Sequence, residues 1–108
     1  MRRVLFICSQ NRLRSPTAER IFSERMGLET ASAGIAADAV HPVTPQTLEW
    51  ADVVLVMEDW HQSELARRFG AELGDKPVIC LDIPDVFAYM DPTLVRLLEA
   101  KAGPILLA

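Results

Sequence analysis

Short apolar runs alternate along this chain with longer segments in which apolar residues recur every three or four positions. The runs predict strands and the periodic segments predict helices. The predicted strands cover residues 3–7, 29–33, 52–57 and 77–81. The predicted helices cover residues 16–26, 45–50 and 59–69, and a last helix opens at Pro92 and ends at Gly103-Pro104. This alternation predicts an α/β fold, a parallel sheet flanked by helices on both faces.

The first and last predicted helices carry start signals. Ser15 is a candidate N-cap of the first, Pro16 suits its first helical position, and Gly27 follows its last periodic residue. Asp91, immediately before the last helix, is also expected to be an N-cap. The apolar faces are expected to comprise Ala18, Ile21, Phe22 and Met26 in the first helix, and Leu94, Val95, Leu97 and Leu98 in the last.

Length and composition limit the class of protein. The chain has 108 residues, 50% of them hydrophobic and 24% charged, so we expect one domain spanning residues 1–108. No stretch is long and apolar enough to span a membrane, so we expect no membrane partner. The apolar run after Arg2-Arg3 is too short for a signal-peptide core, so we expect a cytoplasmic protein. The net charge of -4, without a basic stripe, argues against nucleic acid as a partner.

The segment after the first predicted strand carries the chemistry. Cys8 ends that strand, and Arg14 follows after five intervening residues. Converging loop N–H groups, a helix N-terminus and a guanidinium that grips two oxygens together form a cradle for an oxyanion and favour a thiolate at Cys8. The residues expected to bind phosphate or arsenate are Ser9, Gln10, Asn11, Arg12, Leu13, Arg14 and Ser15.

The run from Val4 to Glu19 resembles the phosphate-binding signature of the low-molecular-weight protein tyrosine phosphatase family. Residues 32–34 and 51–57 resemble its second and third strands. The resemblance implies a single small domain with a four-stranded parallel sheet and a phosphate-binding loop after the first strand. It implies catalysis without metal or cofactor, in which the Cys8 thiolate attacks phosphorus and water hydrolyses the cysteinyl-phosphate. The implied substrates are phosphotyrosine proteins or small aryl phosphomonoesters, with phosphate and vanadate as competitive ligands.

The resemblance also implies roles for individual residues. Ser15 corresponds to the hydroxyl that hydrogen-bonds the sulfur, and Asn11 to a loop asparagine, a residue type that tolerates a left-handed backbone. The family's general acid is an aspartate followed by proline after the fourth strand. We favour Asp85, because an aromatic pair follows it, whereas counting from the strand favours Asp82. Asp91-Pro92 copies the dipeptide but is better explained as a helix cap.

Three loop positions depart from the family. Leu13 stands where the family usually has a second cysteine, so a protective disulfide is not expected and Cys8 should be open to irreversible oxidation. Gln10 replaces a usual glycine, and Arg12 places a cation where the family is often apolar. The segment after residues 32–34 is also shorter than in typical members, which leaves the substrate open.

Two other functions are compatible with the same cradle. An arsenate reductase needs a resolving thiol, and Cys80 lies within an apolar strand, so such a reaction would rely on an external thiol. A phosphate- or phosphoprotein-binding module would keep the cradle without a working acid. His41 and His61 lack cysteine or carboxylate neighbours at ligand spacing, and we expect neither to bind a metal.

Overall fold

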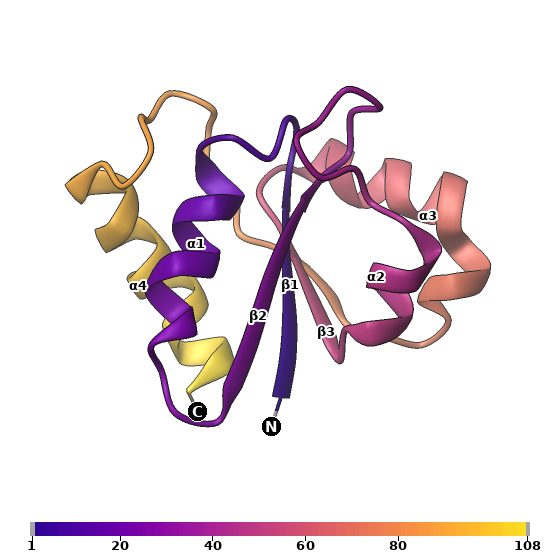
Figure 1. Ribbon diagram of the computed structural model, residues 1–108, viewed down its shortest axis with the longest axis horizontal. Coiled ribbons are helices and arrows are strands. Elements are labelled where there is room, and N and C mark those ends of the chain that lie inside the picture. Colours follow the sequence, from indigo (N-terminus) through magenta and orange to yellow (C-terminus); the bar gives the residue numbers. More distant parts are fainter. Residues whose placement is uncertain (1, 108) are drawn as a thin grey trace.

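In residues 2–107, which the computed structural model describes, four strands form one parallel sheet at the centre of the molecule (Figure 1). The strands are β1 (Arg2–Cys8), β2 (Leu28–Gly34), β3 (Val53–Val56) and β4 (Val78–Cys80). They lie in the order β2-β1-β3-β4, so β1 is paired on both sides. The carboxyl end of β1 therefore lies at the centre of one edge of the sheet, where α/β proteins bind ligands.

Helices cover both faces of this sheet, which confirms the predicted fold class (Figure 1). The helices are α1 (Arg14–Ser23), α2 (Pro45–Trp50), α3 (Asp59–Leu73) and α4 (Pro92–Leu106). Figure 1 shows α1 and α4 together on one face and α2 and α3 on the other. Within the described residues, no helix has the length and apolar character needed to cross a membrane.

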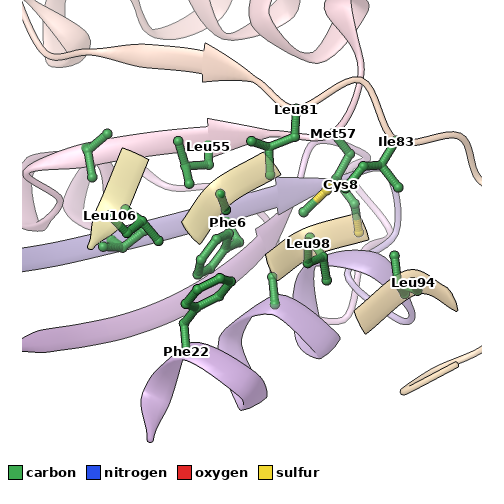
Figure 2. Close-up of a cluster of buried hydrophobic side chains, with 14 of the residues drawn as sticks. Phe6, Cys8, Phe22, Leu55, Met57, Leu81, Ile83, Leu94, Leu98 and Leu106 are labelled. Atoms are coloured by element: carbon green, nitrogen blue, oxygen red, sulfur yellow. The ribbon is translucent and has the colours of Figure 1, made fainter. Parts of the chain in front are cut away.

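Two apolar cores lie on the two faces, and alternate residues of β1 contribute to each. Phe6 and Cys8 point toward α1 and α4, where Phe6 stacks on Phe22 with ring centroids 5.7 Å apart (Figure 2). Leu5 and Ile7 belong to the other core, with α2 and α3. From Val4 to Cys8, β1 is buried on both faces, and this part of its sequence is continuously apolar. The strand thus places Cys8 on the α1/α4 side.

The start of α1 differs from the prediction. The helix begins at Arg14, its N-cap is Leu13, and within the described chain no side chain caps it, so Ser15 is not an N-cap. The Ser15 hydroxyl is instead engaged by Cys8 and by the Ala33 carbonyl. Met26 lies beyond the end of the helix and is 96% exposed, so its assignment to the apolar face was wrong.

The later helices follow their predicted starts better than their ends. Thr44 caps α2, which has its predicted bounds, and Asp91 caps α4 through Oδ1, which accepts from Thr93 N at 2.7 Å. Helix α3 extends to Leu73 past a kink at Phe69, where it was predicted to end. Helix α4 passes through Gly103-Pro104 instead of ending there, because apolar residues such as Ala102 and Leu106 remain packed on the core.

Candidate active site

Residues 9–13 connect β1 to α1 and curve around the Cys8 sulfur. Cys8 is 3% exposed, and its Sγ accepts a hydrogen bond from Asn11 N at 3.2 Å. Asn11 has the expected left-handed backbone, with φ 57°, which turns its N–H toward the sulfur. In the described part of the chain, the N–H groups of Arg12, Leu13 and Arg14 have no protein acceptor. The loop and the first turn of α1 thus offer donors to an anion beside Cys8.

Ser15 ties the sulfur to the surrounding elements. Its Oγ lies 3.0 Å from Cys8 Sγ, accepts from Asn11 Nδ2 at 3.0 Å and donates to the Ala33 carbonyl at 3.3 Å. A hydroxyl has one hydrogen, so in this arrangement a protonated Cys8 donates to Ser15. Once Cys8 is ionised, the hydroxyl hydrogen can turn to the sulfur instead. Ser15 therefore suits both protonation states of the cysteine.

The end of β2 meets the phosphate loop without space for a side chain. A Cβ built on Gly34 would lie 2.8 Å from Ser9 O and 3.0 Å from Asn11 N, and 2.4 Å from Ala39 Cβ. Backbone bonds continue this contact, because Ile35 N donates to Cys8 O at 2.9 Å. The glycine of the Ser32-Ala33-Gly34 segment is thus required by close packing against the loop.

The Arg14 side chain is 1% exposed, and protein acceptors hold the Nη1 side of its guanidinium. Its Nη1 donates to Ile83 O at 2.7 Å and to Glu58 Oε2 at 3.0 Å, which uses both Nη1 hydrogens. Nη2 donates to Ser9 Oγ at 3.4 Å. Among the described residues, Nε–H and one Nη2 hydrogen have no hydrogen-bond acceptor, and Asp85 Oδ1 lies 3.5 Å from Nε. Two such donors side by side match the oxygens of a phosphate.

A hollow of about 110 Å³ opens above Cys8. Its lining residues are Cys8, Gln10, Arg12, Leu13, Arg14 and Asp85. A second hollow of about 450 Å³ includes Arg12, His41 and Tyr89 in its lining. Arg12 therefore borders both hollows. The smaller hollow brings together the nucleophile, the guanidinium and a carboxylate.

The predicted acid residues occupy different places. Asp85 Oδ1 lies 3.5 Å from Arg14 Nε, and Asp85 lines the small hollow. Asp82 is exposed, is not among the lining residues, and its carbonyl accepts from Lys101 Nζ at 2.8 Å. Of the aromatic pair, Phe87 packs against the α1/α4 core and Tyr89 borders the larger hollow. The tertiary structure thus brings Asp85, and not Asp82, to the hollow.

Two residues at the site were not expected from the sequence. Glu58 and His61 follow β3, and Glu58 forms an ion pair with Arg14. His61 is fully buried, and burial, followed by the charge of Arg14, lowers its pKa to about 4. The signal that was available is their position, because the carboxyl ends of parallel strands meet at one edge. Among residues 2–107, no cluster of three or more histidine, cysteine or acidic side chains could hold a metal ion.

Residues 3–51 match the family model described as low molecular weight phosphotyrosine protein phosphatase. These residues make up a little under half of the chain, and they are similar to that family. The match includes the whole phosphate loop and Gly34, and with it the resemblance expected from the Val4 to Glu19 run is confirmed. A search of curated proteins finds no match to this chain.

Solved structures extend the similarity over nearly the whole chain. Wzb from Vibrio vulnificus, in complex with benzylphosphonate, is 25% identical with a TM-score of 0.77, and 96% of each chain is covered. A YwlE mutant from Bacillus subtilis is 26% identical with a TM-score of 0.70, covering 97% of this chain and 99% of that one. The tyrosine phosphatase Wzb from Escherichia coli K30, in complex with phosphate, is 22% identical with a TM-score of 0.76, covering 95% and 94%. At 22% identity, this last match shows similarity of fold alone.

Family and fold together favour a cysteine-dependent phosphatase over an arsenate reductase. The position of Cys80 agrees with this. Cys80 packs against the α2/α3 core, whereas Cys8 belongs to the α1/α4 core, so the sheet lies between the two side chains. An intramolecular cascade from Cys8 to Cys80 would have to cross that sheet.

Proposed function

We propose that this protein is a phosphatase that hydrolyses phosphotyrosine or a similar aryl phosphate monoester through a cysteinyl-phosphate. Cys8 is the nucleophile, Arg14 and the loop N–H groups bind the phosphate, and Asp85 is the general acid. The observation that carries this proposal is the meeting of Cys8, the ligand-facing edge of Arg14 and Asp85 at one hollow. Wzb structures with phosphate and benzylphosphonate support oxyanion ligands. Free phosphate and vanadate are then competitive ligands.

The first chemical step transfers the phosphoryl group to sulfur. The phosphate oxygens take the Arg14 Nε and Nη2 donors, so Asp85 leaves Nε and turns to the leaving oxygen. The Cys8 thiolate attacks phosphorus in line, the P–O bond to the leaving group breaks, and Asp85 donates its proton to that oxygen. Arg14 and the loop N–H groups stabilise the charge on the three remaining phosphoryl oxygens.

The second step restores the enzyme. The Asp85 carboxylate accepts a proton from a water that attacks phosphorus, and the P–S bond breaks. Sulfur leaves as a thiolate, stabilised by Asn11 N–H, by the Ser15 hydroxyl and by the N-terminus of α1. Inorganic phosphate departs. The step needs no resolving thiol, in agreement with the position of Cys80.

A second substrate class is phosphoarginine. A YwlE structure with 25% identity is described as an arginine phosphatase in which a cysteine-to-serine mutant carries a phosphorylated active-site serine. Among residues 2–107, no aromatic side chain lines the small hollow, so its walls do not select for a ring. When a P–N bond breaks, the leaving guanidine nitrogen can also receive the proton of Asp85. We favour the aryl phosphate because Tyr89 borders the adjoining hollow, next to Arg12.

We further propose that the protein acts in the cytoplasm. The support is chemical, since reducing conditions keep thiols reduced and the nucleophile Cys8 is a free cysteine. Leu13 replaces the second loop cysteine, so in the described chain the loop offers no partner for a protective disulfide.

The test is p-nitrophenyl phosphate hydrolysis with a chelator present. We expect Cys8→Ser to abolish turnover and Asp85→Asn to lower kcat by roughly 10²- to 10⁴-fold, the usual contribution of a general acid. Asp82→Asn is the matched comparison and should retain most of the activity. Loss in Asp82→Asn with a normal Asp85→Asn would assign the acid to Asp82.

Two further arms decide between functions. A phosphotyrosine peptide and free phosphoarginine, assayed side by side, separate the two substrate classes. A wild-type protein that is folded and binds inorganic phosphate but hydrolyses none of these compounds would overturn the phosphatase proposal. That outcome would leave the phosphate- or phosphoprotein-binding module.

A further inference from the structure

The imidazole of His61 has a fixed tautomer. Its Nδ1 accepts a hydrogen bond from the backbone N–H of Glu58 at 3.1 Å, at the start of α3. Nδ1 therefore carries no hydrogen, and the neutral ring bears its hydrogen on Nε2. His61 is 0% exposed, so the surrounding protein holds the ring in this orientation. The ring is consequently a dedicated donor through Nε2.

That donor is directed at the first residue of the phosphate loop. His61 Nε2 lies 3.0 Å from Ser9 Oγ, and Arg14 Nη2 donates to the same oxygen at 3.4 Å. Ser9 Oγ thus accepts from both residues, which uses both lone pairs of the hydroxyl. Ser9 is not among the lining residues of the small hollow. Its side chain therefore acts on Arg14 and not directly on a ligand.

Arg14 has protein contacts at all three guanidinium nitrogens, and in the proposed mechanism Asp85 gives up its contact at Nε when a phosphate binds. Ile83 O and Glu58 then still hold Nη1, which fixes one corner of the guanidinium. Ser9 Oγ is the contact at Nη2. Nη2 also carries one of the two hydrogens available to the phosphate. A small rotation would misalign the pair of donors, and misplacement by about 1 Å can cost roughly 10²-fold in rate.

We propose that His61 and Ser9 form a positioning pair that orients the phosphate-binding edge of Arg14. Helix α3, through His61, thereby helps to set the geometry of a loop between β1 and α1. The pair acts at the site of the proposed phosphatase activity and rests on that function. Neither residue touches the reacting atoms, so both are positioning residues.

The experiment compares two disruptive variants with two conservative ones. Ser9→Ala removes the acceptor and His61→Leu removes the donor, whereas Ser9→Thr keeps the hydroxyl and His61→Gln offers an amide N–H near the position of Nε2. We expect each disruptive variant to lower kcat/KM for p-nitrophenyl phosphate and weaken inorganic phosphate binding by roughly 10- to 100-fold. Ser9→Thr and His61→Gln should recover most of both quantities.

Two readouts distinguish positioning from general damage to the fold. Alkylation of Cys8 by neutral iodoacetamide should proceed at the wild-type rate in Ser9→Ala, because Ser9 Oγ has no contact with the sulfur in the described chain. The double variant Ser9→Ala/His61→Leu should have the same kcat/KM and phosphate affinity as the more impaired single variant, because both changes interrupt one chain of contacts. Thermal melts confirm that each variant is folded.

Several results would overturn the positioning pair. Wild-type phosphate affinity and kcat/KM in a folded Ser9→Ala variant would do so, and so would fully additive losses in the double variant. Phosphate affinity is measured by titration with inorganic phosphate and needs no turnover. A wild-type protein that binds phosphate without hydrolysis would therefore refute the proposed function while the Ser9→Ala titration still tests the pair.

Discussion

Three aspartates before α4 have three different surroundings. Asp82 is exposed with a left-handed φ of 55°, Asp85 lies 3.5 Å from Arg14 Nε, and Asp91 accepts from Thr93 N at 2.7 Å. The same side chain thus occurs at an exposed left-handed position, beside the Arg14 guanidinium and at a helix cap. At the scale of the residue, chemical role follows from partners and not from residue type. His61 illustrates the same point with a titratable group.

Protonation of His61 should make stability depend on pH. Its pKa of about 4 in the folded protein lies below the ordinary value of 6.5, because burial and Arg14 disfavour the charged ring. Between these values the unfolded chain binds more protons, so the contribution is complete above pH 6.5 and is lost as pH falls to 4. The loss amounts to about 3 kcal/mol.

Urea unfolding at pH 7 and pH 4 measures this loss. His61→Gln should show a smaller decrease in the free energy of unfolding between the two pH values than the wild type does. His41→Gln is the matched control, because His41 is exposed, and it should follow the wild type. Equal decreases in all three proteins would contradict the assignment to His61.

At the scale of the element, the phosphate loop is shaped by the strand beside it. The carboxyl end of β2 approaches so closely that Ile35 N donates to Cys8 O at 2.9 Å and Ala36 N donates to Ser9 O at 3.0 Å. These bonds hold the loop backbone at Cys8 and Ser9. The loop conformation is therefore a property of three neighbouring elements, since α1 continues directly from it.

Gly34→Ala should disturb the loop without removing any side chain of the site. The added Cβ would lie within 3.0 Å of Ser9 O and Asn11 N, so one of these elements must move. We expect a destabilisation of about 1–3 kcal/mol, typical of overpacking, with weaker binding of inorganic phosphate. Gly70→Ala is the control, since nothing lies within 4 Å of its Cβ in the described chain, and α3 should tolerate it. Normal phosphate binding in Gly34→Ala would refute this account.

At the scale of the whole molecule, the sheet separates the two cysteines. Cys8 faces α1 and α4, and Cys80 packs on the side of α2 and α3. Burial is the main cause that raises the pKa of Cys80, which disfavours its reactive thiolate. The fold thus places Cys8 at the phosphate loop and keeps Cys80 on the other side of the sheet.

Peroxide should therefore inactivate the enzyme without forming an intramolecular disulfide. We expect mass spectrometry to show oxygen additions at Cys8, and activity to become resistant to recovery by dithiothreitol as oxidation proceeds beyond the sulfenic acid. Cys80→Ala should be inactivated at the same rate as the wild type. A mass loss of about 2 Da, the signature of two thiols joined as a disulfide, with activity restored by reduction, would contradict the separation.

Local patterns predicted the order of the elements and the position of the phosphate loop. The continuous apolar run of β1 reflects burial on both faces, and the spacing from Cys8 to Arg14 reflects the length of a loop that surrounds an anion. The helix cap at Asp91 was predictable because its carboxylate accepts a hydrogen bond from a residue of the helix that it precedes. Ser15 was misassigned as a cap because two partners distant from the helix start, Cys8 and Ala33, take its hydroxyl.

Only the tertiary structure decided which distant residues share the site. The choice between Asp82 and Asp85 depends on how the loop after β4 folds over Arg14, and no periodicity encodes that path. Glu58 and His61 join the site because β3 pairs with β1, which brings the start of α3 beside the phosphate loop. Sequence alone fixes contacts between residues a few positions apart. Strand pairing decides the remaining contacts, since it brings together segments that are far apart in sequence.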